Sequence, residues 1–257
     1  MFKNFIPDLG RSAIDGIYQL GGIFILFVQT LKRIFLKSPN WTLVIKQCYQ
    51  CGVLSLPVVL LTGAFTGMVL AVQSFYQFHQ ITMDTAIGIL VGLSMTRELG
   101  PVLTAVMVAG RVGAAMAAEL GTMRVTEQID ALRSMATDPV SYLIVPRFLA
   151  CVIVVPLLTT FAISVGILGG YIVGVKMLHI NHTFFIQNML DFTKVSDLMN
   201  GLVKSSVFGV LIAIISCYKG FTTENGAEGV GIATTEAVVF SCISILVSDF
   251  FLSIILF

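Results

Sequence analysis

Five long apolar runs constrain this sequence more than any other feature. They cover roughly residues 53–78, 85–121, 148–175, 201–218 and 232–257. A helix needs about 20 mostly apolar residues to cross the hydrocarbon core of a bilayer, so each run is long enough to span one. Only 11% of the residues are charged, against roughly 25% in soluble domains. We therefore expect an all-α integral membrane protein, a single domain over residues 1–257, with about five transmembrane helices.

The N-terminal segment, residues 1–45, differs from these runs. Its stretch 12–37 is apolar in the middle but carries several polar and basic residues: Gln19, Gln29, Lys32, Arg33 and Lys37. A helix with one apolar face and a basic polar face is typical of the membrane–water interface. We expect an interfacial helix here, with a spanning helix as the alternative, ahead of a transmembrane core over residues 46–257.

Basic residues gather on one side of this arrangement. They lie before the first run, between the second and third runs, and at the end of the fourth: Lys32, Arg33, Lys37, Lys46, Arg111, Arg124, Arg133, Arg147 and Lys219. Cytoplasmic loops of membrane proteins carry an excess of Lys and Arg. This bias predicts a cytoplasmic N-terminus, cytoplasmic segments at 122–146 and 219–231, and a C-terminus on the opposite, periplasmic side.

Among the ionisable residues inside the apolar runs we single out four: Arg97, Glu98, Lys204 and Asp249. Each costs about 2.5–3.5 kcal/mol at the centre of a membrane helix. Two acids and two bases indicate a buried charge network in which they pair. Two roles stay open for it. It either sets helix packing only, or it forms the polar floor or gate of a cavity that holds a zwitterionic headgroup.

The pair Gly100-Pro101 directly follows these first charges, inside the second run. Proline has no amide N–H and its ring clashes with the carbonyl four residues earlier, so it kinks or breaks a helix. The second run is also too long for one straight span. We expect a kinked or broken helix at this point, with Gly100 and Pro101 as the hinge.

Small residues recur at four-residue spacing along the runs: Gly63/Gly67, Gly88/Gly92, Gly113/Ala117/Gly121 and Gly166/Gly170/Gly174. Such faces let helix backbones approach one another closely in a membrane. We expect these faces to lie in helix–helix contacts.

The segment 122–138 is the most polar stretch between the second and third runs. We expect a short amphipathic helix with Thr126 as its N-cap and Glu127 in its first turn. Its apolar stripe is formed by Val125, Ile129, Leu132 and Ala136. The helix either rests on the bilayer or binds a cytoplasmic partner as a coupling helix. In the second case the expected contacts are Glu127, Gln128, Asp130, Ala131, Leu132 and Met135.

Motifs for catalysis are absent from the sequence. Neither GxxxxGK[ST] nor HExxH occurs, so we expect no nucleotide-binding site and no enzymatic activity in this chain. His179 and His182 are too few to form a metal site, and we expect no metal. The cysteines lie mainly in or beside apolar runs and are expected to be packing residues.

Residues 97–148 resemble the MlaE/YrbE permease family. They read RELGPVLTAVMVAGRVGAAMAAELGTMRVTEQIDALRSMATDPVSYLIVPRF. The resemblance extends through GAFTGMVL (63–70), LGGYIVGV (168–175), LVKSSVFG (202–209) and SDFF (248–251). It implies the membrane permease subunit of an ABC-type system that moves phospholipids between the inner and outer bacterial membranes and maintains outer-membrane asymmetry.

The resemblance also implies partners. The permease is expected to be a homodimer in the inner membrane. An MlaF-like ATPase would bind the segment 122–138 and hold the ATP and Mg²⁺, so this chain needs no cofactor. An MlaB-like STAS protein would sit on the ATPase, and an MlaD-like MCE hexamer on the periplasmic face.

The lipid cavity implied by the resemblance opens between the two permease copies. Its expected lining lies on the outer half of the first span, together with the two charges of the second: Leu70, Gln73, Tyr76, Gln77, Phe78, Ile81, Arg97 and Glu98. Two other functions stay open. One is an ion-coupled secondary transporter that uses the buried charges. The other is a non-transporting membrane anchor for a periplasmic MCE assembly.

Overall fold

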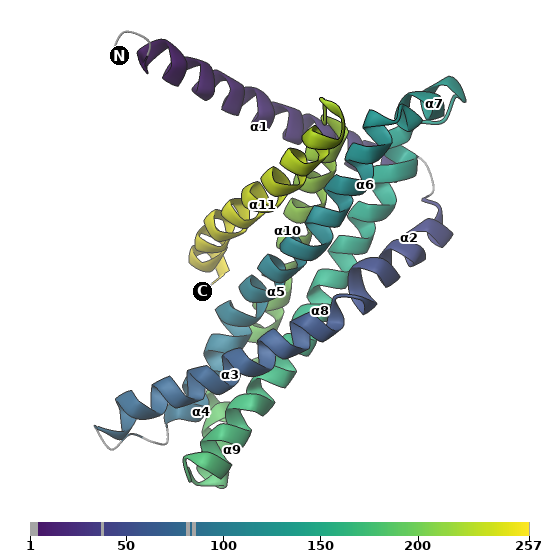
Figure 1. The fold of residues 1–257 in the computed structure, drawn as a ribbon. Helices are drawn as coiled ribbons and strands as arrows, with labels where there is room; N and C mark the ends of the chain where they lie inside the picture. The colour runs from purple at the N-terminus through teal and green to yellow at the C-terminus, as the bar shows by residue number, and fades with distance from the viewer. Residues whose placement is uncertain (1–4, 37–38, 81–82, 84–85, 257) are drawn as a thin grey trace.

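The computed structural model describes residues 5–36, 39–80, 83 and 86–256, and their regular structure is entirely helical (Figure 1). The α-helices are α1 (Phe5–Leu36), α2 (Trp41–Cys48), α3 (Leu56–His79), α4 (Ile87–Ser94), α5 (Gly100–Val108), α6 (Ala114–Val125), α7 (Gln128–Ser134), α8 (Val145–Ile172), α9 (His182–Phe192), α10 (Val195–Phe221) and α11 (Gly226–Leu256). Five π-helical segments join or extend them: η2 (Tyr49–Val53), η4 (Met95–Leu99), η5 (Ala109–Gly113), η6 (Val140–Ile144) and η7 (Val173–Met177).

Six helical stretches in the described part of the chain are long and apolar enough to cross a membrane. They confirm an all-α membrane protein with several spans.

The helices extend beyond the apolar runs because charged residues at the ends of the runs are also helical. Arg147, expected in a loop, lies in the first turn of α8, and Asp197 lies in the first turn of α10. The stretches 41–79, 87–125 and 140–177 are each 38 or 39 residues long, which exceeds a bilayer's thickness at 1.5 Å per residue.

The sixth stretch is residues 16–36 of α1, which the sequence analysis places at the interface. This helix crosses one end of the bundle at a steep angle (Figure 1). Few of its residues are buried, and large apolar side chains such as Ile17 and Phe24 are exposed. An ion pair of 2.9 Å between Arg33 and Asp138 ties its C-terminal end to the segment after α7. The interfacial placement stays a prediction.

Helix α8 lies at the centre of the bundle and packs against α3 on one side and α10 on the other. Small residues make the first contact possible. A Cβ atom on Gly63 would lie 2.8 Å from the carbonyl oxygen of Ala162, and one on Gly67 would overlap the Gly166 carbonyl. The face of Gly63 and Gly67 therefore lies where backbone meets backbone, as in other membrane helix pairs, whereas Gly92, Gly113, Gly121 and Gly174 lie against side chains.

The second span is not broken at Gly100-Pro101. Helical structure continues from Ile87 to Val125, with the π-helical segment η4 immediately before the proline. The amide of Gly100 donates to the carbonyl of Met95, five residues back, which absorbs the irregularity that proline causes. Of the two expected outcomes, a break is absent, because a π-turn lets the helix continue past Pro101; the kink and the hinge at Gly100 and Pro101 stay predictions.

We predict that Gly67→Val destabilises the fold by about 1–3 kcal/mol, because the added side chain must push α3 away from α8. Thermal unfolding of the purified protein in detergent measures the effect. Gly21→Ala is the matched control, since a Cβ at Gly21 meets nothing within 4 Å. Equal unfolding temperatures for the two variants would contradict the tight α3–α8 contact.

Candidate functional site

A buried ammonium group lies at the junction of η4, α10 and α11. Lys204 on α10 is fully buried, and its Nζ lies 2.8 and 2.9 Å from the two carboxylate oxygens of Glu98. The same nitrogen is 2.7 Å from the Ser253 hydroxyl and 3.1 Å from Asp249 Oδ1, both on α11. The structure thus brings together three of the four charges found in the apolar runs, with two carboxylates around one ammonium.

The proline explains part of this geometry. Because Pro101 has no amide N–H, the carbonyl of Arg97 four residues earlier lacks its usual helical donor. Lys204 Nζ lies 3.2 Å from that carbonyl oxygen and donates to it. One side chain therefore satisfies a backbone acceptor released by the proline and neutralises the adjacent carboxylate of Glu98.

The fourth charge, Arg97, has a partner that the sequence analysis missed. Its guanidinium lies 2.9 and 3.1 Å from Asp197 in the first turn of α10. Arg97 therefore pairs with an acid outside the four charges that the sequence singles out. Asp197 was overlooked because the hydropathy of the fourth run rises only at residue 201, so the aspartate was read as part of a loop.

The charge cluster is open on one side. Lys204 is completely buried, but the side chains of Glu98 and Arg97 are 42% and 38% exposed. Both lie inside a stretch that is apolar and long enough to cross a membrane. Where such a stretch lies in the hydrocarbon core, its exposed charges require water, a polar ligand or another chain, because lipid tails cannot solvate them.

The lining residues expected on α3 form a separate surface. Gln73, Tyr76 and Gln77 are exposed, whereas Leu70 and Phe78 are half-buried and pack against the apolar cluster around Ile87. Ile81 lies outside the described residues. The structure therefore divides the expected cavity lining between the exposed row of α3 and the cluster on η4, α10 and α11.

The expected coupling helix is shorter than residues 122–138. Residues 122–125 complete α6, and α7 covers only Gln128–Ser134. Thr126 is not an N-cap, because its hydroxyl donates to the carbonyl of Thr122. Glu127 takes the cap position in a left-handed conformation, with φ of 60°.

The side chains of α7 divide into two faces. Ile129 is fully buried and Leu132 is half-buried, and both pack onto the cluster of Leu120 and Ile144. Val125 and Ala136 are exposed and do not belong to this apolar face. Asp130 is held by Arg124 and Arg133, at 2.9 and 3.1 Å. The free face carries four of the expected contacts: Glu127, Gln128, Ala131 and Met135.

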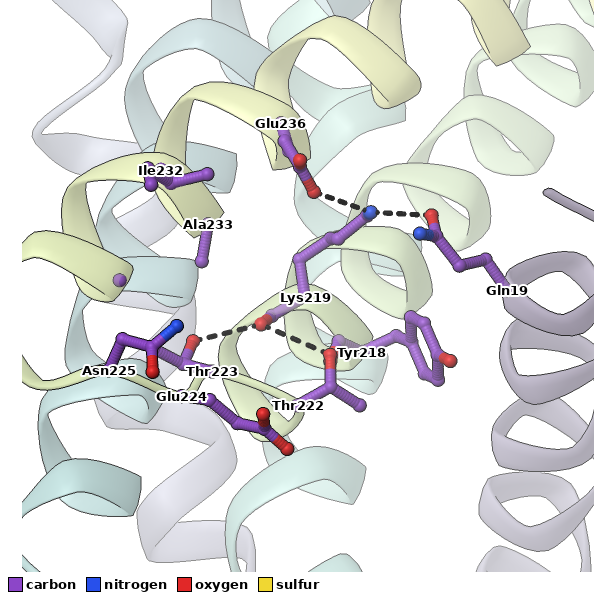
Figure 2. Close-up of a pocket in the computed structure, with 11 residues that line it drawn as sticks. Gln19, Tyr218, Lys219, Thr222, Thr223, Glu224, Asn225, Ile232, Ala233 and Glu236 are labelled. Atoms are coloured by element: carbon purple, nitrogen blue, oxygen red, sulfur yellow. Dashed lines mark hydrogen bonds and ion pairs between the residues drawn. The ribbon is translucent and has the colours of Figure 1, made fainter. Parts of the chain in front are cut away.

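A polar pocket of about 300 Å³ lies at the same end of the bundle, between α1, α10 and α11 (Figure 2). Lys219 crosses it, and its ammonium is held by Glu236 at 2.7 Å and Gln19 at 2.8 Å. The ring of Phe240 lies 4.2 Å below the ammonium. Since its cation is already neutralised, we assign this pocket to the attachment of α1 rather than to a ligand.

The sequence of this chain is similar to those of known proteins. Residues 44–255 match the family described as Permease MlaE. The chain belongs to the MlaE permease family.

Several related proteins align with most or all of this chain. A probable ABC transporter permease protein of Rickettsia typhi is 46% identical over 258 residues, which is 100% of this chain and 99% of the relative. The intermembrane phospholipid transport system permease protein MlaE of Haemophilus influenzae is 39% identical over 261 residues, with 100% and 99% covered. The chloroplastic protein TRIGALACTOSYLDIACYLGLYCEROL 1 of Arabidopsis thaliana is 39% identical over 225 residues, 88% of this chain and 64% of that protein.

We predict that Lys204→Met in this MlaE-family permease lowers the free energy of unfolding by about 2–4 kcal/mol, because it leaves Asp249 and the partly exposed Glu98 without their cation. The triple variant Lys204→Met, Glu98→Gln, Asp249→Asn should recover most of this loss. Lys176→Met, at an exposed lysine, is the matched control. Thermal unfolding in detergent gives the comparison, and a triple variant no more stable than the single one would argue against the cluster.

Proposed function

We propose that this chain is the membrane permease of an ABC-type phospholipid transport system in the bacterial inner membrane, with ATP hydrolysed by a separate subunit. The observation that supports this most is the open charge cluster. Glu98 and Arg97 are exposed at membrane depth, where a headgroup can be paired with them. The family match and the phospholipid transport named for the Haemophilus relative supply the substrate class.

The proposed complex is a homodimer with an MlaF-like ATPase, an MlaB-like STAS protein and an MlaD-like MCE hexamer. A second copy would face the exposed row of α3, so that Gln73, Tyr76 and Gln77 line a cavity between the copies. The α7 end of the bundle would face the cytoplasm and the C-terminus the periplasm. Outer-membrane asymmetry would be maintained by the lipid that this cavity passes on.

The second span offers a mechanical link between the two functional surfaces. Residues 87–125 form one helical stretch, with Glu98 in η4 near one end and the turn into α7 at the other. In the proposed cycle, closure of the ATPase pair moves α7, and this stretch carries the movement to the charge cluster. The π-turn at Met95–Leu99, beside Gly100 and Pro101, is the place where the stretch would flex.

An ion-coupled transporter remains a second candidate because of one observation. Two carboxylates surround a single buried ammonium, so the cluster has one acid more than Lys204 neutralises. Proton-coupled transporters use intramembrane acids of this kind. Transport that ceases on collapse of the proton gradient, with ATP present, would favour this candidate.

We predict that Met135→Asp weakens binding of the ATPase by about tenfold or more, because the side chain is 75% exposed on the free face of α7. Co-purification of the two subunits measures the loss. Met177→Asp is the matched control, since Met177 is 69% exposed at the other end of the bundle. Normal ATPase binding by Met135→Asp would exclude α7 as the coupling surface.

We also predict that Glu98→Gln lowers phospholipid transfer about tenfold while the unfolding temperature and dimer yield stay close to wild type. A glutamine still accepts a hydrogen bond from Lys204, which keeps Asp249 as its counter-charge, so packing survives while the exposed charge is lost. Transfer between donor and acceptor liposomes and thermal unfolding are measured on the same preparation. Normal transfer with a lower dimer yield or unfolding temperature would assign Glu98 to packing instead.

A further inference from the structure

An opening with a mixed polar and apolar lining, distinct from the charge cluster and from the Lys219 pocket, lies between η2 and the stretch formed by η5 and α6. Its volume is about 250 Å³. This is smaller than the roughly 300–1,000 Å³ of sites that enclose whole drug-sized ligands, so it suits a headgroup rather than an entire lipid. Polar and apolar side chains both line it: Gln47, Gln50, Arg111 and Glu119 with Leu54 and Met116.

Arg111 supplies the positive charge of this opening. Its Nη1 donates to Ser55 Oγ at 2.6 Å and lies 3.4 Å from the carbonyl of Gln50. Among the described residues, no carboxylate forms an ion pair with Arg111. A half-buried guanidinium without a counter-charge is suited to a phosphate, which its planar donors bind in two hydrogen bonds.

Glu119 supplies a negative charge two helical turns away on the same stretch. Its side chain is 49% exposed, and one oxygen accepts from Arg147 at 2.9 Å. Arg147 is itself buried, with 8% of its side chain exposed. Arg147 does not line the opening, but it neutralises part of the Glu119 charge from behind, so Arg111 gives the region a net positive charge that favours an anion. The exposed part of Glu119 can pair with an ammonium group beside that anion.

The order of these charges across the membrane matches a phospholipid. Trp41 and Tyr49 are exposed on α2 and η2, the elements that carry Gln47 and Gln50, and such aromatic residues are enriched at the bilayer interface. Arg111 Nη1 lies beside Ser55 and the Gln50 carbonyl, whereas Glu119 lies closer to the α7 end, six residues before the end of α6. In a zwitterionic phospholipid the phosphate is likewise the deeper group and the ammonium the outer one.

We propose that this opening binds the headgroup of a zwitterionic phospholipid, of the phosphoethanolamine type, from the leaflet at the α7 end of the bundle. Arg111 would hold the phosphate and Glu119 the ammonium. Thirteen residues, or about 20 Å of helix, separate Arg111 from Glu98. A lipid headgroup would therefore bind at the two sites one after the other along the same span. The role as an entry or exit station rests on the proposed function, whereas the binding itself does not.

The full chain in nanodiscs, without its ATPase, tests the site. A phosphatidylethanolamine with a photoreactive group in the acyl chain next to the glycerol should label residues 47–54 and 111–119. Arg111→Gln should reduce this labelling about tenfold, because it removes the charge-assisted hydrogen bonds to the phosphate. Ala115→Trp, which fills the opening and leaves the Arg111 contacts intact, should reduce it equally. Arg33→Gln, at an arginine of the same end that pairs with Asp138, is the control and should label normally.

Glu119→Gln separates the two parts of the headgroup. It should reduce labelling by phosphatidylethanolamine several-fold and leave labelling by phosphatidylglycerol, which has no ammonium, unchanged. Unchanged labelling in both Arg111→Gln and Ala115→Trp would overturn the proposal. Displacement of the lipid by inorganic phosphate alone would overturn the lipid assignment in favour of a free-anion site. If labelling follows these expectations but the complete system shows no ATP-driven transfer, the proposed function is wrong and the headgroup site is still supported.

Discussion

The contact between Lys204 and the second span is the interaction on which the rest of the structure depends. A fully buried ammonium is held by Glu98, by Asp249 and by the carbonyl that Pro101 leaves without a helical donor. Either acid alone would be costly in this environment, and the ammonium without them would be more so. The cluster therefore holds η4, α10 and α11 together and leaves Glu98 partly exposed on the open side.

The same helical stretch relates the two ends of the molecule. Its π-helical segments at 95–99 and 109–113 carry Glu98 and Arg111, the two charged groups that we connect with lipid. A π-turn widens the helix by one residue and is frequent at functional sites. The stretch ends at Val125, and a two-residue turn joins it to α7, whose exposed face includes Met135. In the proposed cycle, a movement at α7 would pass through this turn into one continuous helical stretch.

The sequence predicted the fold class, the apolar spans and the charges inside them, because these depend on composition over about 20 residues. It did not locate the partners of those charges. Asp197 and Arg147 are helical and buried although the apolar runs begin only after them. Their burial depends on partners distant in the chain, Arg97 and Glu119, which no local pattern identifies.

Local signals failed for a different reason at two turns. Pro101 predicted a kink or a break, and no break occurs because a backbone shift to π geometry and a donor from α10 compensate for the missing N–H. Thr126 is a residue type that often caps helix N-termini. Its hydroxyl instead donates to the carbonyl of Thr122, in the last turn of α6. The exposed face of α7 was nevertheless predictable, since Gln128 and Met135 follow from helical spacing around the buried Ile129.

The most direct measurement of the central claim is transfer of a labelled phospholipid in proteoliposomes that contain the permease with its ATPase and MCE partners. The account predicts transfer that requires ATP hydrolysis, persists when an uncoupler removes the proton gradient, and falls when Glu98 is replaced by glutamine. Transfer that proceeds without ATP, or that the uncoupler abolishes while ATP is present, would contradict it.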